Sequence, residues 1–361
     1  MAVDAAFWRG KKVLITGHSG FKGSWLSLWL HSMGAEVVGL SRGVPTHPSL
    51  FELARLSEEI ESVEGDIRNA ELVRATVAEH RPEVVLHMAA QPLVRRAYAE
   101  PGETYETNVM GTVNVLEAVR RAGDVRAVVN VTTDKCYENR EWEWGYREDD
   151  PKGGADPYSS SKACSELVTD AYRRSYFSSA PGTALASARA GNVIGGGDWA
   201  EDRLVPDLMR AALERREVKI RNPEAIRPWQ HVLNPLSGYL ALAHAVWNGA
   251  DEAVAFNFGP EERDNRPVWW VADKVVELWG GSLSWSREGL PQPPESHFLK
   301  LDSSRAHLRL GWRPPWDVRE GLGRTVSWFR AYHDGEDMRE VTLAQIRDQQ
   351  ASEADTLAAA T

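Results

Sequence analysis

Short apolar runs rich in β-branched residues alternate with longer amphipathic segments over the first 190 residues. The apolar runs predict six strands, at residues 12–16, 36–40, 60–64, 83–87, 126–131 and 183–188. Apolar residues at helical spacing predict helices between them, at 21–33, 69–80, 102–122 and 157–177. Strands that alternate with helices in this way are typical of a parallel sheet with helices on both faces. The pattern predicts an α/β fold with a doubly wound parallel sheet.

The regular alternation ends near residue 190. A helix at 204–214 is expected to leave the sheet, while segment 229–233, a helix at 235–247 and a strand at 255–258 are expected to rejoin it. This predicts a first domain of residues 1–190, with returning segments near 229–258, and a smaller C-terminal α/β lobe of residues 191–228 and 259–335. Residues 336–361 are charged and then alanine-rich, which predicts a frayed helix or disorder.

The composition is that of a soluble globular protein. The chain has 361 residues, of which 42% are hydrophobic and 26% charged, enough for one large domain and a lobe. No apolar run approaches the roughly 18 to 20 residues that span a bilayer, and the first ten residues do not resemble a signal peptide. We therefore expect a cytoplasmic protein that does not bind membranes.

Charge and cysteine content argue against two further classes. The formal charge of -10 disfavours nucleic acid as a partner. Cys136 and Cys164 lack zinc-ligand spacing, and His87, His231 and His244 lie in apolar surroundings, so we expect packing residues and no metal site. Ten of the 15 tryptophans follow residue 185, which fits either aromatic walls in the C-terminal lobe or a tryptophan-rich core.

A glycine-rich loop follows the first predicted strand. Gly17, Gly20 and Gly23 form a GxxGxxG pattern that opens the first long helix. Glycines let a backbone approach a dinucleotide pyrophosphate closely, and the helix N-terminus meets its negative charge. The position at a strand-to-helix junction favours an NAD(P) site over an ordinary tight turn. The first 190 residues are thus predicted to form a Rossmann domain.

The end of the second strand does not decide between the two nicotinamide cofactors. An acidic residue there would bind the ribose of NAD, and an arginine would suit the 2′-phosphate of NADP. The chain has Ser41 and Arg42, which tilts toward NADP unless Arg42 is a solvated surface residue. The full set of predicted cofactor-binding residues is Gly17, Ser19, Gly20, Phe21, Lys22, Gly23, Ser41, Arg42, Asp66, Ile67, Ala89, Ala90, Gln91, Thr107, Tyr158 and Lys162.

Catalytic chemistry is indicated by a YxxxK pair. Tyr158 and Lys162 lie one helical turn apart, so both side chains emerge on one face. An ammonium and a nicotinamide cation stabilise a phenolate, which can remove a proton from a sugar hydroxyl. Thr133, at the end of the fifth predicted strand, can hydrogen-bond the same hydroxyl.

Longer strings give these motifs their specificity. They include TGHSGFKGSWL, HMAAQPLVRRAY, TTDKCYEN, RAGNVIGGGDWAEDRLVPD and RPWQHVL. Over about residues 7–330 the chain resembles the extended short-chain dehydrogenase/reductase superfamily and, within it, the sugar-nucleotide 4,6-dehydratases of the CDP-sugar branch. The resemblance implies NAD as the cofactor, CDP-glucose as the substrate and a product that feeds deoxysugars of bacterial surface glycans. The nucleotide base is implied by the resemblance alone.

The resemblance also implies an acid and a base for loss of water across C5 and C6. Asp134 and Lys135 follow Thr133 directly and stand where these groups would be. Relatives acting on dTDP- or GDP-sugars have glutamate in place of Lys135. A lysine acts as a base only if its surroundings depress its pKa, so a salt bridge from Lys135 to Asp134 is the alternative.

Substrate contacts are expected mainly from the later segments. Arg227 and Trp229 resemble an RxWxxV motif whose arginine pairs with the diphosphate, a task suited to guanidinium. Surface ion pairs are the alternative for each arginine. The predicted substrate-binding residues are Gln91, Asn192, Arg203, Leu204, Lys219, Arg221, Arg227, Trp229 and Arg305.

Relatives pair two long helices to form dimers, so helices 102–122 and 157–177 imply a homodimer, or a homotetramer. Two other functions compete with the dehydratase. A UDP-hexose 4-epimerase or related reductase would share Thr133, Tyr158 and Lys162 without needing Asp134 and Lys135. A non-catalytic NAD(P)-sensing protein is disfavoured because such proteins commonly lose the tyrosine or the lysine.

Overall fold

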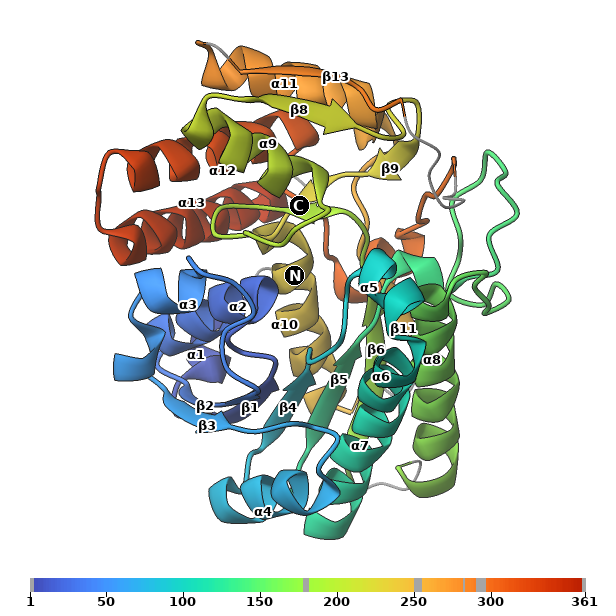
Figure 1. The fold of residues 1–361 in the computed structure, drawn as a ribbon. Helices are drawn as coiled ribbons and strands as arrows, with labels where there is room; N and C mark the ends of the chain where they lie inside the picture. The colour runs from blue at the N-terminus through green and yellow to red at the C-terminus, as the bar shows by residue number, and fades with distance from the viewer. Residues whose placement is uncertain (1–2, 178–181, 250–254, 282, 290–296, 359–361) are drawn as a thin grey trace.

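A seven-stranded parallel sheet forms the centre of the molecule in the computed structural model, which describes residues 3–177, 182–249, 255–281, 283–289 and 297–358 (Figure 1). The strand order is β11-β6-β5-β4-β1-β2-β3. The strands are β1 (Lys12–Thr16), β2 (Glu36–Ser41), β3 (Glu61–Glu64), β4 (Val84–His87), β5 (Ala127–Val131), β6 (Ala184–Arg189) and β11 (Ala255–Asn257). The doubly wound α/β fold is confirmed, since the order reverses at β1 as in dinucleotide-binding sheets.

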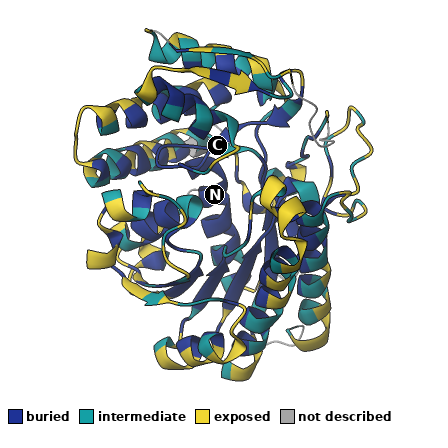
Figure 2. Ribbon diagram, viewed as in Figure 1, coloured by how far each residue is buried: buried dark blue, intermediate teal, exposed yellow. Residues whose placement is uncertain are grey.

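Helices cover both faces of the sheet because both faces of its strands are apolar. Val13 and Ile15 of β1 pack in one core with α2 (Phe21–Ser32) and α10 (Leu233–Trp247). Leu14, between them, packs in a second core with α4 (Ala70–His80) and α7 (Gly111–Ala122). α8 (Pro157–Tyr176) also covers this second face. Figure 2 shows the central strands buried between the two helical layers.

The helix predicted at 102–122 is interrupted. It consists of α6 (Pro101–Tyr105), one π-helical turn at Glu106–Met110 and α7. Gly111, at the start of α7, lets the helix pack closely against Ile67, because a Cβ atom on Gly111 would lie 2.4 Å from Ile67 Cδ1. Such π-turns within helices are frequent at functional sites.

Segment 229–233 does not rejoin the main sheet, so that prediction is wrong. β10 (Gln230–His231) pairs instead with β7 (Val193–Ile194) in a separate two-stranded sheet. The main sheet ends with β11, which pairs with β6. The short apolar run at 229–233 contained no signal for which strand it would join.

The smaller lobe lies above the sheet in Figure 1. It contains α9 (Leu204–Glu214), β8 (Glu217–Ile220), β9 (Ile226–Pro228), β12 (Asn265–Pro267), α11 (Val268–Trp279), β13 (Ser284–Arg287) and α12 (Val318–His333). β8 is parallel to β13, whereas β9 is antiparallel to β12. Several of its tryptophans, including Trp312 and Trp328, belong to the main core. Short helices elsewhere are α1 (Ala5–Trp8), α3 (Leu50–Leu53) and α5 (Val94–Ala99), with single turns at Leu56–Glu58, Asp134–Cys136, Glu262–Asp264 and Ala306–Leu310.

The expectation of a frayed or disordered tail is wrong for α13 (Met338–Ala358). This helix packs on α2 and α12, and its buried stripe includes Thr342, Ile346 and Gln349. Indole N–H groups satisfy the polar part of the contact: Trp328 donates to Thr342 Oγ1 at 3.0 Å and Trp316 donates to Ser352 Oγ at 3.1 Å. A stripe of mostly polar residues has little hydrophobic signal, which is why the sequence pattern did not show it.

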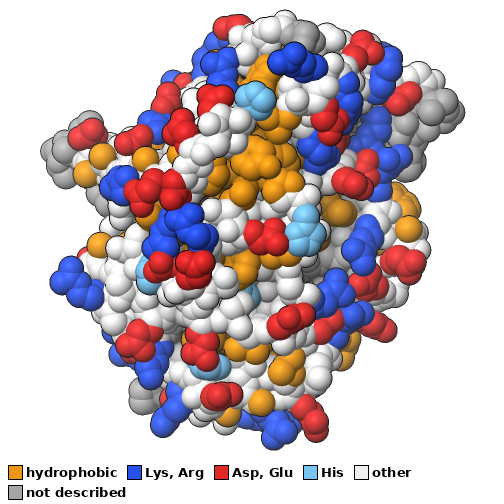
Figure 3. Space-filling model, turned by 60° about the vertical axis from the view of Figure 1, so that its left-hand side comes forward, with side chains coloured by type: hydrophobic (Ala, Val, Ile, Leu, Met, Phe, Trp, Pro, Cys, Tyr) orange, Lys and Arg blue, Asp and Glu red, His pale blue; other side chains and the backbone are white. Residues whose placement is uncertain are grey.

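The surface carries both charged and apolar side chains. Basic and acidic side chains are interspersed over the face shown in Figure 3, where apolar side chains gather in the upper half. Within the described ranges, no helix combines the length and the apolar character that crossing a membrane requires.

Candidate active site

The glycine loop after β1 lets other groups approach its backbone closely. Gly17 has a φ of 77°, and a Cβ atom on it would lie 2.8 Å from Ala89 Cα. A Cβ atom on Gly23 would lie 2.1 Å from the carbonyl oxygen of Gly17. Gly20, which has no side chain to cap the helix, directly precedes α2. The first-turn N–H groups of α2 are therefore available for an anion, as a dinucleotide pyrophosphate requires.

The end of β2 carries a network of polar contacts. Ser41 Oγ lies 2.8 Å from Ser19 Oγ, which also donates to the carbonyl of Gly43. Arg42 NH1 lies 2.9 Å from Glu103 Oε1 and 3.6 Å from Asp66 Oδ2. The guanidinium of Arg42 is therefore already bound to carboxylates. Its surroundings are acidic, which disfavours an added 2′-phosphate.

Other residues predicted to bind the cofactor lie along the same edge of the sheet. The Gln91 side chain is occupied: its amide donates to Leu93 and Thr104, and its oxygen accepts from the backbone of Leu93. Thr107, in the π-turn, has a buried hydroxyl with no hydrogen-bond partner among the described residues. An orphaned hydroxyl of this kind fits a polar group supplied by a ligand. Asp66, Ile67, Ala89 and Ala90 follow β3 and β4, beside the glycine loop.

A cavity of about 600 Å³ lies at the carboxyl edge of the sheet, under the smaller lobe. It is the position expected for ligands of doubly wound sheets. The predicted site residues that line it are Phe21, Lys22, Thr133, Asp134, Lys135, Tyr158, Asn192, Arg203, Leu204, Lys219, Arg221, Arg227 and Trp229. Residues far apart in the sequence thus share one cavity.

Asp134 is a buried carboxyl that faces this cavity. Thr133 caps the single turn at Asp134–Cys136, and its hydroxyl donates to Asp134 Oδ1 at 2.9 Å. The other oxygen, Oδ2, has no hydrogen-bond partner in the described part of the chain. Only glycine fits at Gly191, where a Cβ atom would lie 1.9 Å from Oδ2. Burial raises the pKa of Asp134 despite the positive charges of Lys135 and Arg227, which shifts the group toward its protonated form.

Tyr158 and Lys162 emerge from the first turns of α8. Burial raises the pKa of Tyr158 to about 12, against the lowering effects of a hydrogen bond with Thr133 and of the Arg203 guanidinium. Burial lowers the pKa of Lys162 to about 8, partly opposed by the negative charge of Glu166. Lys162 Nζ donates to the carbonyl of Val131 at 3.3 Å. The ammonium is thereby anchored to the end of β5.

Two further cations lie close to this pair. Lys22 is half-buried and reaches Tyr239 on α10, with 3.5 Å between Nζ and the phenol oxygen. Burial, followed by the charges of Lys162 and Arg203, lowers the pKa of Lys22 to about 7. Arg203 pairs with Asp198 at 2.9 Å. The floor of the cavity is therefore strongly positive, which favours phenolate and phosphate.

The outer part of the cavity carries the predicted substrate residues. Trp229 is buried and its indole N–H donates to the carbonyl of Arg266 at 2.8 Å. Asn192 has a φ of 34°, in the left-handed region. Lys219 lies 3.1 Å from Glu217, and Arg221 lies 3.2 Å from Asp202.

Two predicted substrate residues do not line the cavity. Arg305 binds Asp149 at 2.6 Å and the carbonyl of Ala255, beyond the end of β11. Gln91 is buried beside α6. Direct contact of Arg305 or Gln91 with the substrate therefore stays a prediction. Sequence reasoning in turn missed Asp198, although it lies within the GGGDW string two residues before Ala200.

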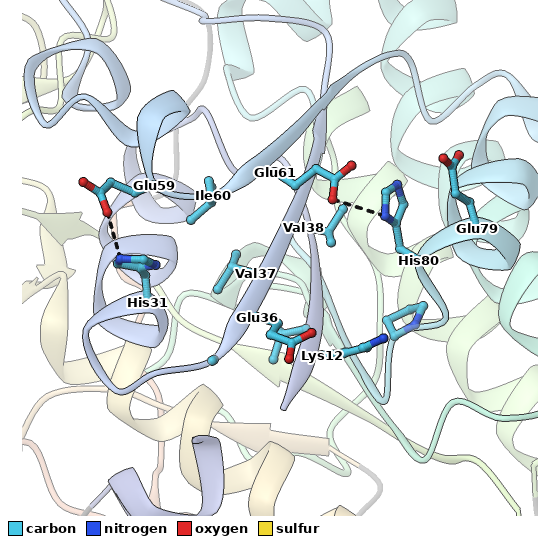
Figure 4. A pocket seen from close by; sticks show the side chains of 13 residues that line it. Lys12, His31, Glu36, Val37, Val38, Glu59, Ile60, Glu61, Glu79 and His80 are labelled. Carbon is cyan, nitrogen blue, oxygen red and sulfur yellow. Dashed lines mark ion pairs between the residues drawn. The ribbon is translucent and has the colours of Figure 1, made fainter. Parts of the chain in front are cut away.

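A second cavity, of about 460 Å³, lies at the opposite end of the strands (Figure 4). Its two histidines pair with glutamates: His31 Nε2 lies 3.0 Å from Glu59, and His80 Nδ1 lies 3.6 Å from Glu61. It contains none of the predicted site residues. Among the described residues, no group of three or more His, Cys, Asp or Glu could hold a metal ion.

The strand order is that of a dinucleotide-binding sheet, with Tyr158 lining the cavity at its carboxyl edge and Lys162 bound to the end of β5. Together with the YxxxK spacing, this arrangement is that of the extended short-chain dehydrogenases/reductases. Within that class, the family model described as GDP-mannose 4,6 dehydratase matches residues 14–255, and the chain belongs to this family.

Individual relatives agree with this assignment. The chain is 55% identical over 351 residues to a CDP-glucose 4,6-dehydratase of Salmonella typhimurium, covering 96% of this chain and 98% of the relative. It is 30% identical to a UDP-glucose 4-epimerase of Mycolicibacterium smegmatis, covering 88% and 98%. The solved structure of a Thermus thermophilus UDP-glucose 4-epimerase in complex with NAD aligns with a TM-score of 0.73 at 26% identity, covering 88% and 98% of the two chains.

Proposed function

We propose that this enzyme is an NAD-dependent hydro-lyase that converts CDP-glucose to CDP-4-keto-6-deoxyglucose and water. The similarity to the Salmonella typhimurium dehydratase supports the substrate. The observation that carries the reaction type is Asp134, a buried carboxyl with a raised pKa that shares a cavity with Tyr158. The proposal includes a cytoplasmic location and a product that feeds deoxysugars.

NAD fits the site better than NADP. The glycine loop, the N-terminus of α2 and the unpartnered Thr107 hydroxyl would hold the dinucleotide. Arg42, the residue that tilted the sequence toward NADP, is bound to Glu103 and lies near Asp66. Two carboxylates next to a ribose would repel a 2′-phosphate and accept hydrogen bonds from ribose hydroxyls. When bound, the nicotinamide would take the C4 hydrogen with its electron pair and return it to C6.

Tyr158 is assigned as the base for the C4 hydroxyl proton. Arg203 places positive charge near the phenol, and Lys162 lies one helical turn further along α8. A cationic nicotinamide would add to this charge and favour the phenolate. Thr133 lies next to Asp134 at the end of β5 and can orient the same hydroxyl. These three residues would account for oxidation at C4.

Asp134 and Lys135 are assigned to the elimination. Asp134, in its protonated form, would donate a proton to the leaving C6 hydroxyl, and Lys135 in the same cavity would remove the C5 proton that the C4 ketone has acidified. A Lys135→Ala variant should lose exchange of the C5 proton with deuterated solvent. If that variant keeps near-native turnover, the assignment of the base is wrong.

The remaining residues would bind the nucleotide diphosphate. Arg227, Trp229, Asn192 and Lys219 line the outer part of the cavity, beyond Tyr158. Guanidinium suits the diphosphate because it forms paired hydrogen bonds with two oxygens. Arg203, by contrast, lies at the catalytic floor, where Asp198 holds it.

The deciding experiment compares nucleotide sugars. Purified protein is incubated with CDP-, dTDP-, GDP- and UDP-glucose, with and without added NAD or NADP, and the products are identified by mass and NMR. Loss of water from CDP-glucose without net accumulation of reduced cofactor supports the dehydratase. A changed C4 configuration at constant mass would establish an epimerase instead. Cofactor binding without turnover of any sugar would indicate a sensing protein.

We also propose a homodimer formed through the outer helices. Large apolar side chains are exposed on α5, on the π-turn and on α8: Tyr98, Met110, Leu167 and Tyr176 have relative exposures of 45%, 52%, 60% and 57%. Apolar groups exposed together in this way mark interaction surfaces. Light scattering should give twice the chain mass at micromolar concentration, and a monomer would refute the dimer.

A further inference from the structure

A buried ion pair lies directly behind the catalytic face of α8. Glu166 follows Lys162 by four residues and Tyr158 by eight, so the three side chains lie on one side of the helix. Glu166 and Arg189 are 5% and 2% exposed. Arg189 donates from Nε to Glu166 Oε1 at 2.9 Å and from NH2 to Oε2 at 2.6 Å. Glu166 and Arg189 thus form a bidentate ion pair between α8 and the end of β6.

The same carboxylate also holds the strand ends that carry the site. Glu166 Oε1 accepts a hydrogen bond from Thr132, the residue before Thr133, and Oε2 accepts one from Ser187 of β6 at 2.8 Å. Lys162 donates to Val131, the last residue of β5. Glu166 therefore ties the helix that carries Tyr158 and Lys162 to the strand end that carries Thr133.

Arg189 extends the connection away from the cavity. Its NH1 group donates to Tyr137 Oη at 2.8 Å and to the carbonyl of Glu148 at 2.9 Å. Tyr137 in turn donates to Asn257 of β11 at 2.6 Å. Arg189 has no polar atom left to face the substrate, and its charge is balanced by Glu166.

The electrostatic surroundings of Lys162 come from several elements. Glu166 on α8 raises the pKa of Lys162 against burial, and Cys136 acts in the same direction. The Lys162 charge also acts on Lys22 of α2 and on His87 of β4, whose pKa values are lowered first by burial and then by that charge. Burial raises the pKa of Cys136 to about 12 and lowers that of His87 to about 3, so both are neutral near pH 7.

Glu166 is thus the anion that faces a cluster of buried cations. Burial opposes its ionisation, but the Arg189 guanidinium and the hydrogen bonds from Arg189, Thr132 and Ser187 outweigh burial and lower its pKa. Lys152, from the loop before α8, also feels this charge. Removing the carboxylate charge would leave the buried Arg189 guanidinium without its ion-pair partner and would remove the charge that raises the pKa of Lys162.

We propose that Glu166 is a positioning residue for the reaction: balanced by Arg189, its carboxylate keeps Lys162 charged and holds α8 in register with the end of β5. Glu166 does not line the cavity, so it acts through Lys162 and Thr133 and not on the sugar. This inference rests on the proposed dehydratase function.

Glu166→Gln tests the charge while nearly preserving the shape. We expect the pH above which kcat falls to move down by about one unit, because loss of a nearby opposite charge lowers the pKa of Lys162. We expect KM for CDP-glucose to change less than about twofold, since only binding contacts would move it. Rates are measured from product formation by NMR between about pH 6 and 10, a range that brackets the Lys162 pKa of about 8.

Two further variants make the test independent of folding. Glu166→Asp keeps the charge on a shorter side chain, so kcat should fall while the upper pH limit stays within a few tenths of a unit of the unaltered enzyme. Glu166→Gln combined with Arg189→Gln restores charge balance and should move the limit back toward its original value. Circular dichroism and thermal unfolding establish that each variant is folded.

Asp170→Asn is the matched control, because Asp170 lies one turn further along α8 and forms ion pairs with Arg173 and Arg174 at the helix surface. It should leave the pH profile unchanged. The inference is overturned if a folded Glu166→Gln enzyme keeps the original pH profile, or if Glu166→Asp shifts it equally. If the unaltered protein does not dehydrate CDP-glucose at all, the proposed function fails instead.

Discussion

Two cavities open at opposite ends of the same parallel strands, and they differ in how deeply their charged side chains are buried. At the carboxyl ends, Asp134 is 2% exposed and has one oxygen without a hydrogen-bond partner among the described residues. At the amino ends, the side chains of His31 and Glu59 are 33% and 28% exposed and pair with each other. Acidic residues and histidines occur at both ends, so residue type alone does not distinguish them.

The difference shows what makes a cavity chemically active. Burial shifts the pKa values of Asp134, Tyr158, Lys162 and Lys22 away from their ordinary values. Such shifts place proton donors and acceptors near the pH at which they must work. The ion pair of His31 and Glu59 in the amino-end cavity is partly exposed to solvent, which screens its charges. Predictions that separate the two ends therefore concern proton transfer first.

The largest effect is expected from Asp134→Asn. An amide cannot supply the proton for the leaving hydroxyl, so kcat should fall by roughly 10² to 10⁴. Because Lys135 and Tyr158 are retained, C5 should still exchange its proton with deuterated solvent when CDP-glucose is added. NMR measures both quantities in one sample. An Asp134→Asn enzyme with native turnover would show that another group protonates the C6 hydroxyl.

The next effect is the pH dependence of the unaltered enzyme. The pKa of Lys162 is lowered to about 8, so its ammonium is present below that pH and is lost above it. Without the ammonium the phenolate of Tyr158 is less favoured, and kcat should fall about tenfold for each pH unit above 8. Product formation measured from pH 6 to 10, roughly centred on this pKa, tests the sign. A kcat that rises steadily through this range contradicts the assignment of Lys162.

A smaller effect is expected for cofactor choice. Replacing Glu103 with alanine removes the partner that lies 2.9 Å from Arg42 and leaves Asp66 at 3.6 Å. Arg42 could then meet a 2′-phosphate, and the preference for NAD over NADP should fall several-fold, roughly the effect of one exposed ion pair. Dissociation constants for both cofactors measure this preference. Glu106→Gln, which affects the neighbouring Arg68 instead, is the control and should leave the preference unchanged.

The sequence predicted those parts of the site that follow from local spacing. Gly17 and Gly23 lie in one loop, where a Cβ atom on either would collide with the neighbouring backbone. Tyr158 and Lys162 lie on the same face of α8 because they are one helical turn apart. The main-sheet strands predicted over residues 1–190 were placed to within one residue, since buried parallel strands have continuous apolar runs.

Features that depend on distant parts of the chain were not predictable in the same way. The pairing of Glu166 with Arg189 needs α8 to lie across β6, and that of Arg203 with Asp198 needs the loop before α9 to fold back. α13 was taken for a frayed tail because its buried contact uses polar groups such as Thr342, which the indole of Trp328 satisfies. The sequence left open whether Arg42 binds a 2′-phosphate or is a surface residue, because its carboxylate partner, Glu103, is 61 residues away.

The smallest effect is expected at the amino ends of the strands. Glu61→Gln removes an ion pair in which His80 Nδ1 lies 3.6 Å away and the glutamate side chain is 62% exposed. Exposed pairs contribute little, so the melting temperature should change by less than about 2 °C and kcat should stay the same. Differential scanning calorimetry and the NMR assay measure the two. If Glu61→Gln reduced turnover as strongly as Asp134→Asn, burial would not be what separates the two cavities, and the amino-end cavity would have to take part in the reaction.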